Sequence, residues 1–262
     1  MQAHDPRIFV TQCAFRALMD ALARPGRIFR VPTLPGAQLA NPFLECIVRT
    51  LLDRHCGFAV ASCASDGGAQ LAGHVAAHVG LTTSAARVAP DRASFALLTA
   101  DVPRAEQAAL IAALTGGTAL SPERGATALV ECRRLSDAAE RQRASGDVGR
   151  QRPHDGAEGF LWEVAGPGVR SHQLFASSED GWFAGRLRRH DEFPCGIDLL
   201  LVDRQGNLVG LPRTARIKAG VCALQGEGGG DASGAAVPAG VGPGGASTAA
   251  ASAGARALQG EG

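Results

Sequence analysis

The stretch Phe193-Pro194-Cys195-Gly196-Ile197-Asp198-Leu199-Leu200-Leu201-Val202-Asp203 decides the fold of this 262-residue chain. Ile197 to Val202 is an almost continuous apolar run, which is typical of a strand covered on both faces. Arg204-Gln205-Gly206-Asn207 then supplies a turn, and a second apolar run follows from Leu208 to Leu211. The pattern predicts a β-hairpin whose strands lie in a buried sheet.

One acidic residue, Asp198, interrupts the first apolar run. An unpaired carboxylate is costly to desolvate there, so we expect a partner nearby. If the turn spans Arg204 to Asn207, antiparallel pairing places Asp198 about opposite Arg213. The pair is either an ion pair kept for structure or part of a binding site. Burial in a hairpin favours the structural interpretation, and the sequence leaves both open.

Helical and extended patterns alternate along the rest of the chain, which predicts a layered α/β domain. Four apolar residues at i, i+3, i+4 and i+7 predict an amphipathic helix over 10–23 that buries one stripe, formed by Phe15, Leu18, Met19 and Leu22. Further helices are expected at 43–52 with Asn41 as N-cap, at 105–114, and around Trp182 to Leu187 with Ser178-Glu179-Asp180 as a cap. Strands are expected at 28–31, 58–62, 94–99, 126–132 and 160–165. Residues 70–79 fit either a short helix or an extended segment.

Composition narrows the function classes. The net charge of +1 gives no reason to expect nucleic acid or an anionic membrane as a partner. No segment approaches the roughly 20 apolar residues of a membrane span, and the N-terminus lacks a signal-peptide pattern. The seven cysteines include no C-x-x-C pair and are expected to be reduced thiols. We therefore expect a cytoplasmic protein.

Motifs for phosphate loops, zinc and hydrolases are weak or absent. The only lysine is Lys218, so no G-x-x-x-x-G-K-[ST] loop exists. His74 and His78 have the spacing of a zinc pair on a helix, but no glutamate follows His74 and no third ligand is evident, so structural or surface histidines are the commoner outcome. We assign no catalytic, cofactor-binding or metal-binding residue.

Polar residues near the hairpin form the candidate site. A basic run at Arg186, Arg188, Arg189 and His190 precedes the hairpin, and such a run is either a solvated helix end or a phosphate-binding surface. The candidate polar or phosphate cluster consists of Asp198, Arg213, Thr214, Arg189 and His190. Gly166-Pro167-Gly168 fits a sharp turn, or less commonly a backbone nest for an anion.

Two segments differ in composition from the rest. Residues 136–159 are polar and charged, which predicts an exposed insertion in a domain spanning 1–218. Residues 219–262 are rich in Ala and Gly and contain Ala-Leu-Gln-Gly-Glu-Gly twice, so a disordered tail is expected.

Several stretches resemble one protein family in their order and spacing. They are Phe15-Arg16-Ala17-Leu18-Met19-Asp20-Ala21-Leu22-Ala23-Arg24-Pro25-Gly26, Ser121-Pro122-Glu123-Arg124-Gly125-Ala126-Thr127, Gly166-Pro167-Gly168 and the hairpin from Phe193 to Thr214. This pattern resembles PhnH, the H subunit of the bacterial carbon–phosphorus lyase system for phosphonate use. The resemblance implies a three-layer sandwich with a mixed sheet, like pyridoxal-phosphate-dependent transferases but without the cofactor. The position of Lys218 next to the predicted tail agrees with the missing cofactor, because a Schiff base needs a lysine in a packed site.

The resemblance also implies a role and partners. A homodimer, or pairing with the J subunit, is expected within a complex of G, H, I and J subunits. The H subunit is needed with G and I, and with the L protein, to transfer the ribose triphosphate moiety of ATP to an alkylphosphonate, giving ribose 1-phosphonate 5-triphosphate. We expect an accessory, assembling role in this transferase complex. The alternatives are a ligand-binding or catalytic component with a phosphate or nucleotide site around Asp198 and Arg213, and a dimeric α/β protein unrelated to phosphonates.

Overall fold

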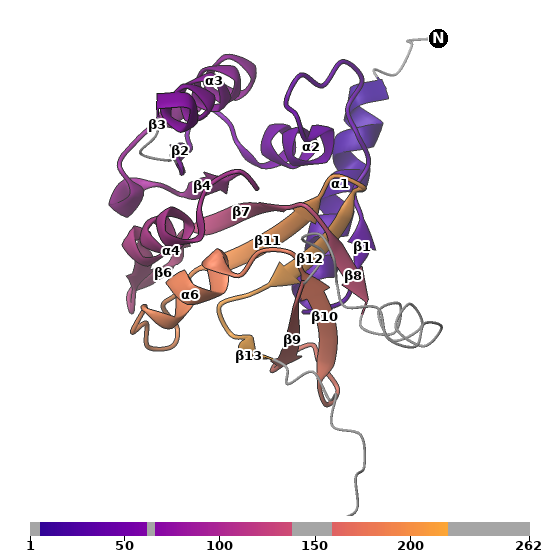
Figure 1. Cartoon of the computed structure of the whole chain (residues 1–262), viewed down its shortest axis with the longest axis vertical. Coiled ribbons are helices and arrows are strands. Elements are labelled where there is room, and N and C mark those ends of the chain that lie inside the picture. The colour runs from indigo at the N-terminus through magenta and orange to yellow at the C-terminus, as the bar shows by residue number, and fades with distance from the viewer. Residues whose placement is uncertain (1–5, 62–65, 138–158, 220–262) are drawn as a thin grey trace, which may run out of the picture. The chain divides into compact units, whose positions relative to one another are not determined.

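The computed structural model describes residues 6–61, 66–137 and 159–219 (Figure 1). The helices are α1 (Pro6–Ala23), α2 (Pro42–Leu51), α3 (Asp66–Thr83), α4 (Arg104–Ala113) and α6 (Gly181–Leu187), with a 3-10 turn η1 (Pro90–Arg92). The strands are β1 (Phe29–Arg30), β2 (Gly57–Val60), β3 (Ala86–Arg87), β4 (Phe95–Leu98), β5 (Gly116–Thr118), β6 (Ser121–Gly125), β7 (Thr127–Cys132), β8 (Leu135–Asp137), β9 (Phe160–Ala165), β10 (Gln173–Ser177), β11 (Asp198–Asp203), β12 (Asn207–Leu211) and β13 (Arg216–Ala219). Most of the predicted charged insertion and nearly all of the predicted disordered tail lie outside the described residues.

A seven-stranded mixed sheet forms the centre of the fold, in the order β1-β12-β11-β7-β4-β2-β3. Strands β11, β7, β4, β2 and β3 are parallel to their neighbours in this series. Strand β12 is antiparallel to β11, and β1 is antiparallel to β12. The predicted hairpin therefore joins the parallel part of the sheet to its antiparallel edge.

The central strands are buried on both faces, as the apolar runs predict. Leu97, Leu129 and Leu200 belong to one hydrophobic core, which α1, α2 and α3 complete. Leu98 and Val130, one residue further along their strands, belong to a second core, which α4, α6 and the four-stranded antiparallel sheet β13-β9-β10-β8 complete. Figure 1 shows these elements on the two sides of the central sheet. The predicted α/β class with a mixed sheet is confirmed, whereas the likeness to pyridoxal-phosphate transferases stays a prediction.

Helix α1 forms where a helix was predicted, but the predicted buried stripe is wrong in part. Leu18 is buried, whereas Phe15 and Met19 are 49% and 53% exposed. The residues that pack on the sheet beside Leu18 are Ala14 and Ala21. The reason is the close approach of α1 to β12: a Cβ added to Gly210 would lie 2.5 Å from the carbonyl carbon of Ala21. Only small side chains fit between the two backbones.

The two predicted helix caps have different outcomes. Asn41 caps α2 as predicted, because its side chain accepts hydrogen bonds from the N–H groups of Phe43 and Leu44, both at 3.0 Å. Asp180 occupies the N-cap position of α6, but its side chain makes no cap hydrogen bond. It binds the guanidinium of Arg104 at 2.8 Å instead.

Other segments were left open or missed. Residues 70–79, which fitted either a helix or an extended segment, lie in α3. Strands β3, β5, β6, β8, β10 and β13 were not predicted. Lys218 lies in β13 with its side chain exposed, and Ala219, which was predicted to begin the tail, ends this strand. Residues 136 and 137, predicted as part of the exposed insertion, lie in β8. None of the helices in the described part combines the length and hydropathy of a membrane span.

Candidate functional site

The hairpin places Asp198 beside Arg213, as predicted. Strand β11 pairs with β12 so that Leu199 faces Leu211. This register brings Asp198, just before Leu199, close to Arg213, which follows the end of β12. Asp198 Oδ1 accepts a hydrogen bond from the backbone N–H of Arg213 at 2.7 Å, and Oδ2 lies 2.8 Å from Arg213 Nη2. Arg213 also donates to the carbonyl oxygen of Pro122. The hydrogen bond to Asp198 raises the pKa of Arg213 above its usual value. The contacts of this pair are those of a structural clamp.

Replacing Asp198 with asparagine is expected to lower the free energy of unfolding by about 2 kcal/mol, because the Arg213 guanidinium loses its charged acceptor. Urea unfolding of the wild type and the variant measures the change. Asp91→Asn, at an exposed position on η1, serves as the control and should leave the stability unchanged. Wild-type stability for Asp198→Asn would show that the pair is not a structural clamp.

Arg189 is also fully engaged. Its Nε and Nη2 atoms bind the carboxylate of Asp191 at 2.5 and 2.9 Å. Its Nη1 atom donates to the carbonyl oxygens of Ile111 and Leu114, at 2.9 and 2.6 Å, where helix α4 ends. A cation at a helix C-terminus satisfies carbonyls that have no partner within the helix. Arg189 therefore joins α6 to the end of α4.

Arg186 differs from these two arginines, because no carboxylate among the described residues contacts it directly. Its Nη2 atom donates to the carbonyl oxygens of Pro212, Arg213 and Ala215, at 3.0 to 3.1 Å. Burial lowers the pKa of Arg186 to about 10, with Asp198 and Asp191 acting in the opposite direction from a distance. Its guanidinium is still protonated at neutral pH.

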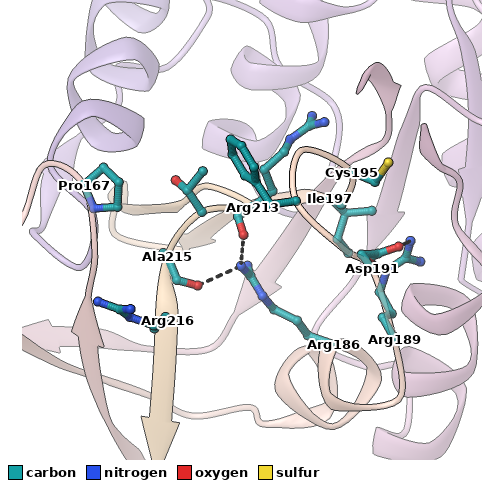
Figure 2. Close-up of a pocket in the computed structure, with 12 residues that line it drawn as sticks. Pro167, Arg186, Arg189, Asp191, Cys195, Ile197, Arg213, Ala215 and Arg216 are labelled. Atoms are coloured by element: carbon teal, nitrogen blue, oxygen red, sulfur yellow. Dashed lines mark hydrogen bonds and ion pairs between the residues drawn. The ribbon is translucent and has the colours of Figure 1, made fainter. Parts of the chain in front are cut away.

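These residues border a pocket of about 520 Å³, which we call the hairpin pocket (Figure 2). The pocket is lined by Pro167, Arg186, Arg189, Asp191, Phe193, Cys195, Gly196, Ile197, Arg213, Thr214, Ala215 and Arg216. Of the predicted cluster, the structure brings Arg189, Arg213 and Thr214 to this pocket. Asp198 stands behind Arg213 and does not line it, and His190 is exposed outside the lining.

The cluster predicted from the sequence omitted two lining cations, Arg186 and Arg216. Arg186 was part of the basic run before the hairpin, so a signal for it existed. Arg216 followed no pattern, because strand β13 was not predicted. The Gly166-Pro167-Gly168 segment forms a turn that is closed by a hydrogen bond from the Val169 N–H to the Gly166 carbonyl at 3.1 Å.

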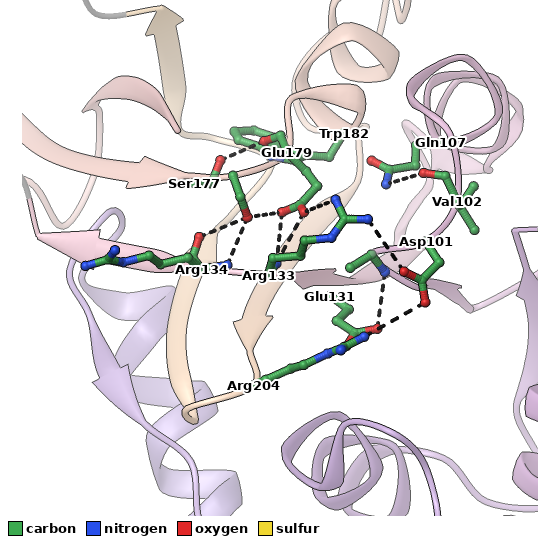
Figure 3. A network of polar contacts seen from close by, with 12 residues as sticks. Asp101, Val102, Gln107, Glu131, Arg133, Arg134, Ser177, Glu179, Trp182 and Arg204 are labelled. Atoms are coloured by element: carbon green, nitrogen blue, oxygen red, sulfur yellow. Dashed lines mark hydrogen bonds and ion pairs between the residues drawn. The ribbon is translucent and has the colours of Figure 1, made fainter. Parts of the chain in front are cut away.

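A second polar network lies where β4, β7 and β11 end (Figure 3). Glu131 is buried, and its carboxylate accepts from Arg204 Nε at 2.9 Å and from the Ala100 N–H at 3.2 Å. Glu179 accepts from the backbone N–H of Arg133 at 3.1 Å. The hydrogen bond to Glu131 raises the pKa of Arg204. The buried carboxylates of Glu131 and Glu179 in this network are both paired with donors, so the network has the contacts of a structural ion-pair cluster that joins the ends of the strands. Glu131 inside an apolar strand was the signal for it in the sequence.

The possible zinc pair is not brought into a metal site. His74 is exposed, whereas His78 Nε2 lies 3.1 Å from the carboxylate of Glu45. Across the three described ranges, no group of three or more His, Cys, Asp or Glu side chains is arranged to hold a metal ion.

Comparison with known proteins decides the family. The model of the family described as bacterial phosphonate metabolism protein (PhnH) matches residues 3–218. The chain belongs to the PhnH family. It is 30% identical over 208 residues to a Stutzerimonas stutzeri protein named as the C-P lyase subunit HtxG, covering 79% of this chain and 85% of that protein. It is also 30% identical over 222 residues to the Rhizobium meliloti protein named alpha-D-ribose 1-methylphosphonate 5-triphosphate synthase subunit PhnH, covering 82% of this chain and 92% of that protein.

The PhnH match covers every residue that lines the hairpin pocket. It includes α1, the central sheet and the hairpin, and it ends within β13, two residues after Arg216. The predicted family is therefore confirmed, and the whole wall of the hairpin pocket lies inside the PhnH region.

Proposed function

We propose that this chain is a subunit of a carbon–phosphorus lyase complex that acts mainly through contacts with other subunits. The observation that carries the proposal is the PhnH family match over residues 3–218, together with relatives named as subunits of a C-P lyase and of a ribose 1-methylphosphonate 5-triphosphate synthase. In this proposal the partners are the G, I and J subunits. The assembled complex, acting with the L protein, transfers a ribose triphosphate group to an alkylphosphonate.

An exposed apolar surface on α1 supports a role in assembly. Ile8, Phe9, Phe15 and Met19 are 49 to 69% exposed, although all four are large apolar side chains on one helix. Ile8, Phe15 and Met19 are spaced by seven and four residues, so they share one side of the helix. Contiguous exposed apolar side chains often mark protein contacts. We assign this α1 apolar face to a contact with another subunit of the complex.

Co-purification tests the proposed function. We expect the tagged chain, expressed with the G, I and J subunits, to retain them through affinity and size-exclusion steps. Changing Phe15 and Met19 together to serine should weaken this retention by about tenfold or more, because buried apolar anchors dominate interface energies. The thermal stability of the isolated chain should stay close to that of the wild type, because both side chains are already half exposed.

A matched double variant separates assembly from general surface effects. Leu81→Ser with Leu120→Ser removes two exposed leucines outside α1 and should leave retention unchanged. If the wild-type chain retains no partner, the proposed function is wrong. If the α1 variant retains all partners, the α1 apolar face is not the contact. A light-scattering mass of two copies for the isolated chain, lost in the α1 variant, would show that a second copy occupies this face. The cytoplasmic location remains a prediction.

A further inference from the structure

We infer that the hairpin pocket is a binding site for the tetrahedral oxyanion of a phosphate- or phosphonate-bearing small molecule, held by Arg186, Thr214 and Arg216. This inference concerns the isolated chain and does not depend on its assembly with other subunits. It differs from the site expected from the sequence, which centred on Asp198 and Arg213. Those two residues already bind each other.

The pocket carries excess positive charge. Four arginines and one carboxylate are among its lining residues. Asp191 is engaged by Arg189, and Asp198 engages Arg213 from behind the wall. Two arginines in the wall, Arg186 and Arg216, are then left without a contacting carboxylate in the described part of the chain. An anion in the pocket would supply the missing counter-charge.

Arg186 is held in place for such a contact. Its Nη2 atom is fixed by three carbonyl oxygens of the loop between β12 and β13, and Nη1 makes one longer contact of 3.4 Å with the Leu211 carbonyl. No described residue accepts a hydrogen bond from its Nε. Figure 2 shows its guanidinium beside Ala215, among the residues that line the pocket. A fixed planar guanidinium with spare donors suits phosphate-type oxygens, because little side-chain freedom is lost on binding.

Thr214 and Arg216 supply further donors on the adjacent loop and strand. Within the described ranges, neither the Thr214 hydroxyl nor the Arg216 guanidinium makes a hydrogen bond or ion pair. Both residues line the pocket. Hydroxyl and guanidinium groups are common donors to phosphate oxygens. Thr214 adds a neutral donor to the fixed cation of Arg186. The exposed Arg216 side chain points away from Arg186 in Figure 2, and it adds a charged donor when it turns toward an anion bound there.

The rim of the pocket offers an aromatic surface. Phe193 lines the pocket, and its side chain is 82% exposed. A pocket of about 520 Å³ has the size of a small-ligand site. Bases of nucleotides stack on such exposed rings. The oxyanion can therefore belong to a nucleotide, with its base on Phe193, or to a free phosphate or phosphonate.

Calorimetric titration of the full chain with AMP, inorganic phosphate and methylphosphonate tests the site. We expect saturable binding of at least one of them, weakened about tenfold or more by Arg216→Ala and measurably by Thr214→Val. Arg188→Ala removes an equal charge from an exposed position outside the pocket, and it should bind like the wild type. Phe193→Ala should weaken AMP alone if the ligand is a nucleotide, and should change nothing if it is a free oxyanion.

Chemical protection gives a second measurement. Cys195 lines the pocket, whereas Cys13 lies on α1. The bound ligand should slow alkylation of Cys195 by iodoacetamide, measured by peptide mass spectrometry, and leave Cys13 unchanged. The inference is overturned if none of the three probes binds, or if Arg216→Ala and Arg188→Ala bind equally well. Binding without protection of Cys195 would also overturn it. None of these results bears on retention of the other subunits, so the proposed function is tested separately.

Discussion

Replacing Asp203 with alanine is expected to lower the free energy of unfolding by roughly 3 to 5 kcal/mol. The Asp203 side chain is 0% exposed and accepts four hydrogen bonds. Oδ1 accepts from the N–H groups of Gln205 and Asn207, both at 2.9 Å. Oδ2 accepts from the Leu135 N–H at 3.0 Å and from the Asn207 side chain at 2.7 Å. Alanine leaves these donors without an acceptor, in the hairpin turn and in the adjoining strand β8.

Urea unfolding with two further variants tests this explanation. Asp203→Asn keeps one side-chain oxygen and should lose less stability than Asp203→Ala. Asp53→Ala also removes an acceptor for a turn N–H, that of His55 at 2.8 Å, but at an exposed position. Its effect should be much smaller. Equal losses for Asp203→Ala and Asp53→Ala would show that burial of the four contacts is not what makes Asp203 important.

The second large effect is expected at Glu45, which is 1% exposed in helix α2. Its Oε2 atom accepts from the N–H groups of Gln38 and Leu39, at 2.5 and 2.7 Å, and Oε1 lies 3.1 Å from His78 Nε2. Glu45→Gln places an amide N–H₂ group among donors. We expect a loss of roughly 2 to 4 kcal/mol at neutral pH, measured by urea unfolding.

The loss of stability caused by Glu45→Gln should depend on pH. Burial by itself raises the pKa of Glu45, but hydrogen bonds from the backbone of Leu39 and Gln38, together with His78, outweigh it. The pKa in the folded protein is therefore below the usual value of 4.5. A carboxyl group with a lowered folded pKa adds stability above its unfolded pKa, and this stability is lost as the pH falls through the folded pKa.

The stability difference between the wild type and Glu45→Gln should thus be full above pH 4.5 and should narrow as the pH falls below it. Glu123→Gln, at an exposed position on β6, is the control and should show little difference at any pH. A difference at Glu45 that stays constant through acidification would contradict the assignment of its stabilising effect to the ionised carboxylate.

The central sheet could be predicted because its strands are buried on both faces. Strands β4, β7 and β11 each appear in the sequence as short, largely apolar runs, and burial on both faces explains why polar and apolar residues do not alternate along them. Strands β8 and β13 were missed because they are short and pair with strands distant in sequence. Strand β10 was also missed, although its partner β9 directly precedes it in the chain. Strand β13, for example, exists through its pairing with β9, in which Ile217 faces Val164. No local pattern encodes that pairing.

The candidate site was predictable only where local geometry determined it. A short hairpin turn fixes the register, and the register places Asp198 beside Arg213. The contacts that the arginines of the basic run make could not be predicted in the same way. Arg189 appeared free in the sequence, but the carbonyls that it binds end helix α4, more than seventy residues earlier. Arg186 appeared equivalent, yet it binds carbonyl oxygens of the loop after β12, and no carboxylate in the described ranges contacts it.

The position of β12 also determines when, during synthesis, the N-terminal part of the domain can fold. Strand β1 pairs with β12 through Phe29 and Leu208, and α1 packs against Gly210. Strand β1 and helix α1 leave the ribosome first, but they can pack in the sheet only after β12, one of the last strands, has been synthesised. A nascent chain that stops before Asp198 lacks the partner of its own N-terminus, as well as its C-terminal strands. Folding of this domain is completed only after nearly all of residues 6–219 have been synthesised.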